Sequence, residues 1–111
     1  MIDNRDGNIL SKILSEVSFL RNEVNATNYE KFMADERTKR VFAMTVLNIG
    51  ELANSLSKKV KNLKEIKLDE VIMLRHLTAH GYHQLRFDVV WRTATIDIPA
   101  MEMQIKKLLN R

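Results

Sequence analysis

The sequence predicts an all-α protein, an up-and-down bundle of four to five helices, and three observations favour this fold class. Apolar residues recur at steps of three and four along almost the whole chain, and no segment alternates apolar and polar residues for long. Aromatic residues make up only 6%, and three glycines with one proline are too few for a turn-rich β-sandwich. A length of 111 residues, 45% of them apolar, suits a single domain over residues 1–111 with its own core.

The composition excludes several classes of protein. Without cysteine the chain has no disulfide framework and no thiolate metal site, which fits a reducing compartment. The longest stretches without Asp, Glu, Lys or Arg are ten residues, whereas a membrane-spanning helix needs about 20 apolar residues. The first residues lack the basic-then-apolar pattern of a signal peptide, so we expect a cytoplasmic protein with no membrane partner. A net charge of +4 permits a polyanionic partner but does not prove one.

The first element expected is an amphipathic helix from about Asp6 to Glu23. Its apolar stripe consists of Ile9, Ile13, Val17, Leu20 and Val24, with Leu10 and Leu14 beside it. After a break, Thr27 and Glu30 fit a capping box, in which each residue bonds the other's backbone N–H. A short helix that contains Phe32 is therefore expected next.

A longer helix is predicted from Asp35, whose carboxylate suits a helix amino terminus, to about Lys59. Its main apolar stripe is Val41, Met44, Thr45, Leu47, Asn48, Leu52, Leu56 and Val60. Phe42, Val46 and Ile49 lie off that stripe, so the helix is apolar on more than one side. Either it is a fully surrounded core helix or it carries a second buried face, and we favour the second face and therefore a dimer.

The remaining chain supplies two more helices after a connection over residues 62–67. A third helix is expected from Leu68 to near Gly81, because glycine readily adopts the left-handed conformation that ends a helix. Asp88 is expected to cap the last helix, and Pro99 within it to cause a kink because proline has no N–H. The core stripe of that helix is Val89, Val90, Ala94, Ile98, Met101, Ile105, Leu108 and Leu109.

All three histidines of the chain, His76, His80 and His83, fall within eight residues at the predicted end of the third helix. Residues 71–87 around them include no Asp or Glu, although the chain has fourteen acids, so this segment is electropositive. Histidine moves protons near neutral pH, and the neighbouring Arg75 can hold a phosphate through two hydrogen bonds.

Arg75, His80 and Tyr82 together suit a phosphodiester better than a peptide or sugar substrate. Arg75 and His80 are five residues apart, and they converge if His80 lies in a fraying last turn. RNA brings its own nucleophile, the 2′-hydroxyl, so a metal-free RNase needs little more than a base, an acid and a cation. A second copy of the chain across a dimer interface could supply the second proton carrier.

Three other interpretations of the same residues remain open. His76 and His80 have the spacing of zinc ligands, with His83 near, but no glutamate lies between them as in a hydrolytic zinc helix. Arg75 and a histidine could instead be buried and tie the third helix to its neighbours. The segment could also bind an anion or a nucleotide without turnover.

The pattern Arg75-x4-His80-x-Tyr82 looks like the Arg-x4-His-x-Tyr signature of HepT-like toxins, within the HEPN superfamily (higher eukaryotes and prokaryotes nucleotide-binding). Other segments resemble the family in the same order, and the resemblance covers roughly residues 5–109. They are Phe32 to Val41, Asn48 to Ala53, Asp88 to Trp91, and Asp97 to Pro99.

The resemblance implies a HEPN-like bundle that dimerises, with the motifs of both subunits facing a shared cleft. Active members are metal-independent RNases that act as toxins and need no cofactor, and their RNA cleavage would rest here on Arg75 for the phosphate and His80 for the proton. Their usual partner is a minimal nucleotidyltransferase antitoxin, which adenylylates the motif tyrosine, here Tyr82. Added AMP would place bulk and negative charge where the RNA phosphate must bind.

The sequence departs from the family pattern at His76, where the family commonly has asparagine, and this histidine could be a second proton carrier. His83 and Arg86 match no motif position and are either RNA-backbone contacts or exposed loop residues. The alternative function is a non-catalytic HEPN module that binds a nucleotide or partners a nucleotidyltransferase. A purely structural helical adaptor is a third interpretation.

Overall fold

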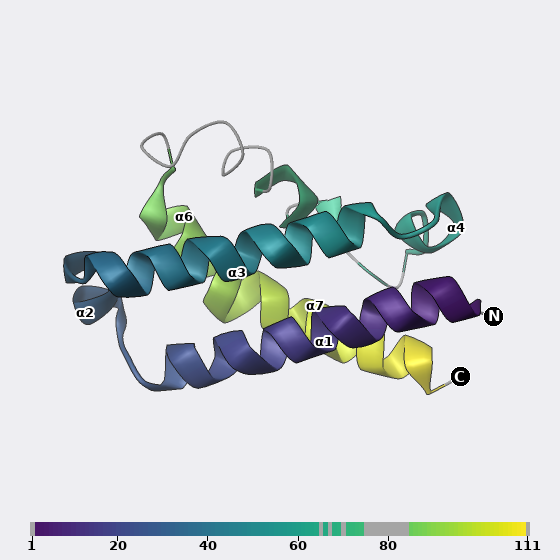
Figure 1. Cartoon of the computed structure of the whole chain (residues 1–111), viewed down its shortest axis with the longest axis horizontal. Helices are drawn as coiled ribbons and strands as arrows, with labels where there is room; N and C mark the ends of the chain where they lie inside the picture. The colour runs from purple at the N-terminus through teal and green to yellow at the C-terminus, as the bar shows by residue number, and fades with distance from the viewer. Residues whose placement is uncertain (1, 65, 67, 70, 75–84, 111) are drawn as a thin grey trace.

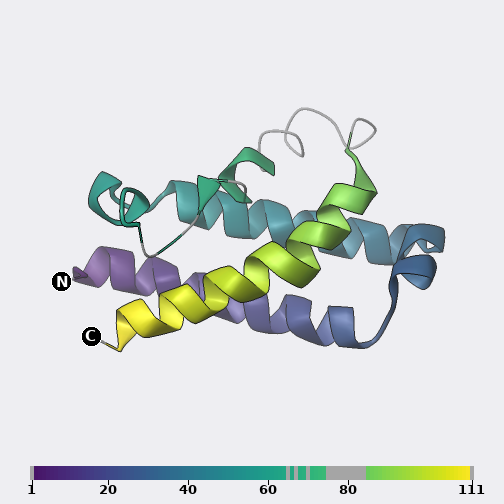
Figure 2. The same ribbon diagram turned by 180° about the vertical axis from the view of Figure 1, so that it is seen from behind.

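The computed structural model of the chain describes residues 2–64, 66, 68–69, 71–74 and 85–110. Within those ranges all regular structure is helical, which confirms the all-α prediction. α1 and α3 run antiparallel along one face, and α6 with α7 crosses behind them (Figures 1 and 2). The elements are α1 Asn4–Asn25, α2 Tyr29–Ala34, α3 Glu36–Asn54, α4 Lys58–Lys61, α6 Phe87–Arg92, the π-helical turn η2 Thr93–Asp97, and α7 Ile98–Leu109.

α1 begins two residues earlier than predicted, because Asp3 caps it. The Asp3 carboxylate accepts a hydrogen bond of 2.8 Å from the backbone N–H of Asp6. Of the stripe expected from the spacing, Ile13, Val17 and Leu20 are buried, whereas Ile9 and Val24 at its ends are half-buried. Leu10, expected beside the stripe, is fully buried as well. α1 packs most extensively against α3 and also contacts α7, so this stripe lies at the centre of the bundle.

The short helix α2 is present as predicted, but Asn28 and not Thr27 caps it. The Asn28 side-chain oxygen accepts a hydrogen bond of 3.0 Å from the backbone N–H of Lys31. Asparagine and threonine are both good capping residues, so the sequence alone left the boundary open by one position. Phe32 lies on the buried side of α2 and is fully covered.

α3 inverts the two faces expected from the sequence. The residues predicted to lie off the main stripe, Phe42, Val46 and Ile49, are fully buried in the core. Within α3, Thr45 is buried as the predicted main stripe requires. The other members of that stripe are exposed or only half-buried, namely Val41, Met44, Leu47, Asn48 and Leu52. The helix does carry two apolar sides. The side that contains Phe42 is the buried one, and α3 packs against α1 and α6.

The long helix predicted from Asp35 to about Lys59 ends five residues earlier, at Asn54. Ser57 interrupts it, because its hydroxyl accepts a bond from the N–H of Val60 and so caps a new helix, α4. Leu56 and Val60 are buried on either side of this break.

A widened π-helical turn, η2, stands directly before Pro99 in the last helix, where the sequence predicts a kink. The N–H of Ile98 bonds the carbonyl of Thr93, five residues back, which is the π-helical spacing. Pro99 then stands in the first turn of α7, where its missing N–H costs little. Residues Val90, Ala94, Ile98, Met101, Ile105 and Leu108 are buried as expected, whereas Val89 is half-buried and Leu109 is exposed.

Asp88 does not cap the last helix, contrary to the prediction. The helix begins at Phe87, the residue before Asp88 in the chain, and the capping position belongs to Arg86, which makes no side-chain cap bond. Asp88 lies in the first turn, where its charge meets the positive end of the helix dipole.

Candidate functional site

The predicted catalytic motif lies outside the residues that the structure describes. Arg75, His76, His80, Tyr82 and His83 all belong to residues 75–84, which have no described position. The expected end of the third helix at Gly81 lies in the same segment. What the structure describes is how the chain enters and leaves this segment.

The chain enters the motif from a short buried helical stretch, residues 71–74. Ile66, Leu68, Val71 and Leu74 are buried in the common core. Met73 on the same stretch is exposed, so only one side of it packs inward. Arg75 therefore follows directly after a residue whose position is fixed by core packing.

The chain leaves the motif at Leu85, which is also buried. Two residues later an aromatic cluster holds α6 against α2 and α3. Phe32 of α2 contacts Phe87 edge-on with 6.3 Å between ring centroids, and it contacts Trp91 at 5.1 Å. Trp91 also stacks on Phe42 of α3 at 5.9 Å, with 11° between the ring planes. Core packing therefore fixes Leu74 and Leu85, the two residues that flank the ten-residue segment.

Arg86 is the one predicted site residue with a described position. Its side chain is 75% exposed, and its Nη2 donates a hydrogen bond of 2.8 Å to Oδ2 of Asp88. This bond is the main cause of the lowered pKa of Asp88, and it outweighs the partial burial that raises it. An exposed ion pair of this kind contributes little to stability, so the guanidinium can exchange Asp88 for a phosphate at small cost.

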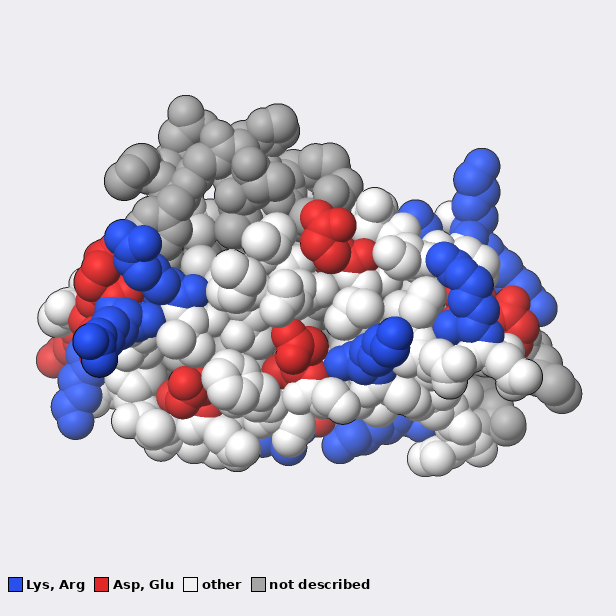
Figure 3. Space-filling model, in the orientation of Figure 1, with Lys and Arg blue, Asp and Glu red and all other residues white. Residues whose placement is uncertain are grey.

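Further cations lie on the first two turns of α3, next to α6. The ammonium of Lys39 lies 5.0 Å from the ring centroid of Phe87, and it also pairs with Glu36 at 3.4 Å. Glu36 pairs with Arg40 as well, at 3.2 Å. Figure 3 shows blue and red side chains gathered at this end of the molecule, over α2 and the start of α3. Positive and negative side chains of α3 therefore lie next to α6, the helix that follows the motif.

The zinc interpretation concerns the undescribed segment, since all three histidines lie there. Across the described part of the chain, no group of three or more His, Cys, Asp or Glu side chains is placed to hold a metal ion. No helix in the same part is long and apolar enough to cross a membrane.

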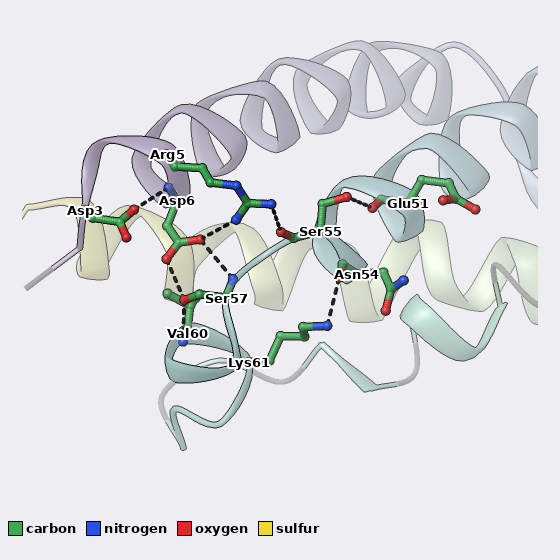
Figure 4. A network of polar contacts seen from close by, with 9 residues as sticks. All are labelled: Asp3, Arg5, Asp6, Glu51, Asn54, Ser55, Ser57, Val60 and Lys61. Atoms are coloured by element: carbon green, nitrogen blue, oxygen red, sulfur yellow. Dashed lines mark hydrogen bonds and ion pairs between the residues drawn. The ribbon is translucent and has the colours of Figure 1, made fainter.

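A polar network at the opposite end of the molecule was missed by the sequence reasoning (Figure 4). Asp6 of α1 is only 2% exposed, and it accepts hydrogen bonds from the Ser57 hydroxyl at 2.6 Å and the Ser57 N–H at 3.0 Å. Arg5 adds a bond to the carbonyl of Ser55. The network joins the start of α1 to the break between α3 and α4, and so directs the chain toward the helix that leads to the motif. The only indication of this network in the sequence is the position of Asp6, four residues before Leu10 and on the apolar side of the helix.

Comparison with known proteins identifies the family. A sequence model of the family described as "Ribonuclease HepT-like" matches residues 13–108. The chain belongs to the HepT-like ribonuclease family. The match includes the whole motif and every described helix except the first nine residues of α1 and the last residue of α7.

The names of similar proteins agree with this family. A protein of Caldanaerobacter subterraneus subsp. tengcongensis named "Putative RNase" is 28% identical over 103 residues, which cover 92% of each chain. The "Probable ribonuclease HepT" of Thermococcus cleftensis is 25% identical over 89% of this chain and 91% of its own. A "Putative RNase" of Methanocaldococcus jannaschii is 25% identical over 91% and 88%. No solved structure matches the chain significantly.

Proposed function

We propose that the chain is the toxin of a toxin–antitoxin pair, a metal-independent endoribonuclease that acts in the cytoplasm as a homodimer. The observation that carries the proposal is the motif Arg75-x4-His80-x-Tyr82, in a chain of the HepT-like ribonuclease family. The buried residues on both sides of the motif support it, because a catalytic segment needs fixed ends to hold its groups in position.

In the proposed reaction, Arg75 binds the scissile phosphate and stabilises its developing negative charge. His80 takes the proton from the 2′-hydroxyl, and the 2′-oxygen then forms a bond to phosphorus. The bond from phosphorus to the 5′-oxygen breaks, and that oxygen receives a proton from a second carrier. His76 or a group of the second subunit supplies this proton. The products are a 2′,3′-cyclic phosphate and a 5′-hydroxyl.

The outer side of α3 supports the homodimer. Met44 is 57% exposed there, and Leu47 and Leu52 are only half-covered, although helix α3 is otherwise the centre of the core. Figure 3 shows white surface over the middle of this face, along α3 and α1, with a few acidic and basic side chains scattered in it. A second copy would bury these apolar side chains and bring two motifs together.

The proposed control of the toxin is adenylylation of Tyr82 by a partner nucleotidyltransferase. The phenolic oxygen of Tyr82 attacks the α-phosphorus of ATP, and pyrophosphate leaves. The attached AMP brings a negative charge to an electropositive segment and occupies the place of the RNA phosphate. His83 and Arg86 would contact the RNA backbone, and the high exposure of Arg86 supports its part in this.

Expression of the chain alone tests the proposal in cells. We expect growth arrest, rescue by His80→Ala, and rescue of the parent chain by co-expression of a cognate nucleotidyltransferase. Mass spectrometry should then find AMP on Tyr82 only in the co-expressed sample. Growth arrest that persists in His80→Ala would contradict catalysis through this motif. A protein without RNase activity would instead be the nucleotide-binding partner module.

A further inference from the structure

An exposed aromatic ring of α2 lies beside α6, the helix that follows the motif in the chain. The Tyr29 side chain of α2 remains 44% exposed, although it contacts Trp91 edge-on with 5.9 Å between ring centroids and 64° between planes. Trp91 is in turn held by Phe32 and Phe42, which are both fully buried. The Tyr29 ring is therefore held in place by Trp91 on one side and open to solvent on the other.

Two arginines lie at the two ends of α6, Arg86 at its capping position and Arg92 as its last residue. Arg92 follows Trp91 directly, is exposed, and makes no ion pair within the described residues. Asp88 lies one turn before Arg92, on the same side of the helix, and binds Arg86 at 2.8 Å. Arg86 and Arg92 thus belong to one flank of α6, the helix that also carries the Trp91 ring on which Tyr29 packs.

This surface is close to the proposed catalytic residues along the chain. Arg86 follows Tyr82 by four residues, and four residues of fully extended chain reach at most about 14 Å. A single strand covers that distance in a few nucleotides. A strand whose phosphate is bound by the motif can therefore reach α6 with its next nucleotides.

We propose that the surface formed by Tyr29, Arg86 and Arg92 binds the single-stranded RNA that flanks the cleaved bond. A base stacks on Tyr29, and the two arginines bind the adjoining phosphates. Single-stranded RNA exposes its unstacked bases to aromatic side chains, whereas bases in a duplex are already stacked. The inference rests on the proposed RNase function and assigns its substrate class, RNA with an unpaired flank.

Packing alone does not require the exposed ring. Phe32 and Phe42 already fill the space around Trp91, and a leucine at position 29 would cover the same edge of that ring. Leucine has no flat π-face for a base, so Tyr29→Leu separates the packing role of this residue from stacking. Tyr29→Phe keeps the ring and removes only the hydroxyl.

Binding is measured in the His80→Ala background, with Tyr82 shown by mass spectrometry to be unmodified, so that cleavage does not interfere. The probe is a fluorescein-labelled, unstructured oligoribonucleotide, followed by anisotropy. We expect Tyr29→Leu to weaken binding about tenfold and Tyr29→Phe to change it less than twofold. Both variants should keep the melting temperature within a few degrees of the parent. A variant that unfolds would be replaced by Tyr29→Met, with the same expectation.

Trp91 gives a direct reading of the contact, because it is the only tryptophan in the chain and lies against Tyr29. Titration with the same RNA without its label should change the fluorescence of Trp91. The change should be lost in Tyr29→Leu even at RNA concentrations that saturate binding. A fluorescence change in Tyr29→Leu as large as that of the parent would overturn the stacking contact.

The phosphate contacts are tested by salt dependence, with Lys107→Gln as the matched control. Lys107 is an exposed cation on α7, and the end of α7 lies at the opposite end of the molecule from α2 (Figures 1 and 2). Arg92→Gln should lower the slope of log K against log salt by about 0.7, the value for one phosphate of a single strand. Lys107→Gln should leave the slope unchanged.

These experiments distinguish a failure of the RNA-binding surface from a failure of the proposed RNase function. If the active chain cleaves RNA and loses cleavage in His80→Ala, but Tyr29→Leu and Arg92→Gln bind and cleave like the parent, this inference is wrong and the proposed function stands. Equal affinity for the single strand and its duplex would also contradict the inference. If the parent chain neither cleaves nor binds RNA, the proposed function fails first. A surface that captures a protein and no RNA would overturn the inference as well.

Discussion

The buried role of Asp6 is seen in the fold but could not be predicted from the sequence. Its partner Ser57 is 51 residues away, so no local pattern connects the two. Arg75, His80 and Tyr82 could be singled out, by contrast, because they lie within eight residues and carry distinctive chemistry. Residue types in a short window can be read from sequence, whereas a buried polar contact between distant elements cannot.

The Asp6 network leads to a prediction about stability and pH. Burial by itself raises the pKa of Asp6, but the hydrogen bonds from Ser57 and the charges of Arg5 and Lys59 outweigh it and lower the pKa. The stabilisation is therefore present above the ordinary pKa of aspartate and is lost as the pH falls through the lowered value. At neutral pH, Asp6→Ala should reduce the free energy of unfolding by about 2 kcal/mol, because two donors lose a charged acceptor.

Urea unfolding at several pH values checks this prediction. The difference in unfolding free energy between the parent and Asp6→Ala should be constant near neutrality and shrink below about pH 4. A difference that stays the same at about pH 2 would show that the negative charge of Asp6 does not hold the network.

At the scale of elements, helices were predicted more reliably than their ends and faces. α1, α2 and the disturbed last helix follow from the spacing of apolar residues and from Pro99. The ends depended on capping side chains that compete with one another, as at Asn28 and Ser57. The two faces of α3 were inverted because both are apolar, and only the neighbouring helices decide which one is buried.

Gly7 offers a test of α1 as an element. It stands inside the helix, and a Cβ added there would meet only Cγ2 of Ile2, at an ordinary contact distance of 3.9 Å. Gly7→Ala should therefore stabilise the protein by about 0.5–1 kcal/mol, because alanine loses less backbone entropy in a helix. Thermal unfolding should show a rise of a few degrees. A lower melting temperature would mean that another chain or segment approaches the helix closely at Gly7.

At the scale of the whole molecule, the fold class could be predicted from composition and periodicity, but the assembly could not. A second apolar face on α3 indicated a dimer, and the exposed Met44 on that face is where a partner would be disturbed first. Met44→Glu should produce a monomer by light scattering at micromolar concentration and should abolish RNA cleavage, because a buried charge without a partner opposes association.

Met103→Glu is the matched control for the dimer. Met103 is 63% exposed on α7, which lies behind α1 and α3 in Figure 1. This variant should remain dimeric and active. Circular dichroism should show native helix content in both variants. A parent chain that is already monomeric, or a monomeric Met44→Glu that still cleaves RNA at the parent's rate, would contradict the shared cleft.

RNA cleavage in EDTA tests the central claim most directly. Purified chain, shown by mass spectrometry to carry no AMP on Tyr82, is incubated with total RNA beside its Arg75→Ala and His80→Ala variants. We expect the parent to cleave RNA without metal and both variants to lose at least about a hundredfold in rate, the usual contribution of a proton carrier or a charge-stabilising group. Verified unmodified protein that leaves the RNA intact would contradict the account, and Arg75 and His80 would then be binding residues.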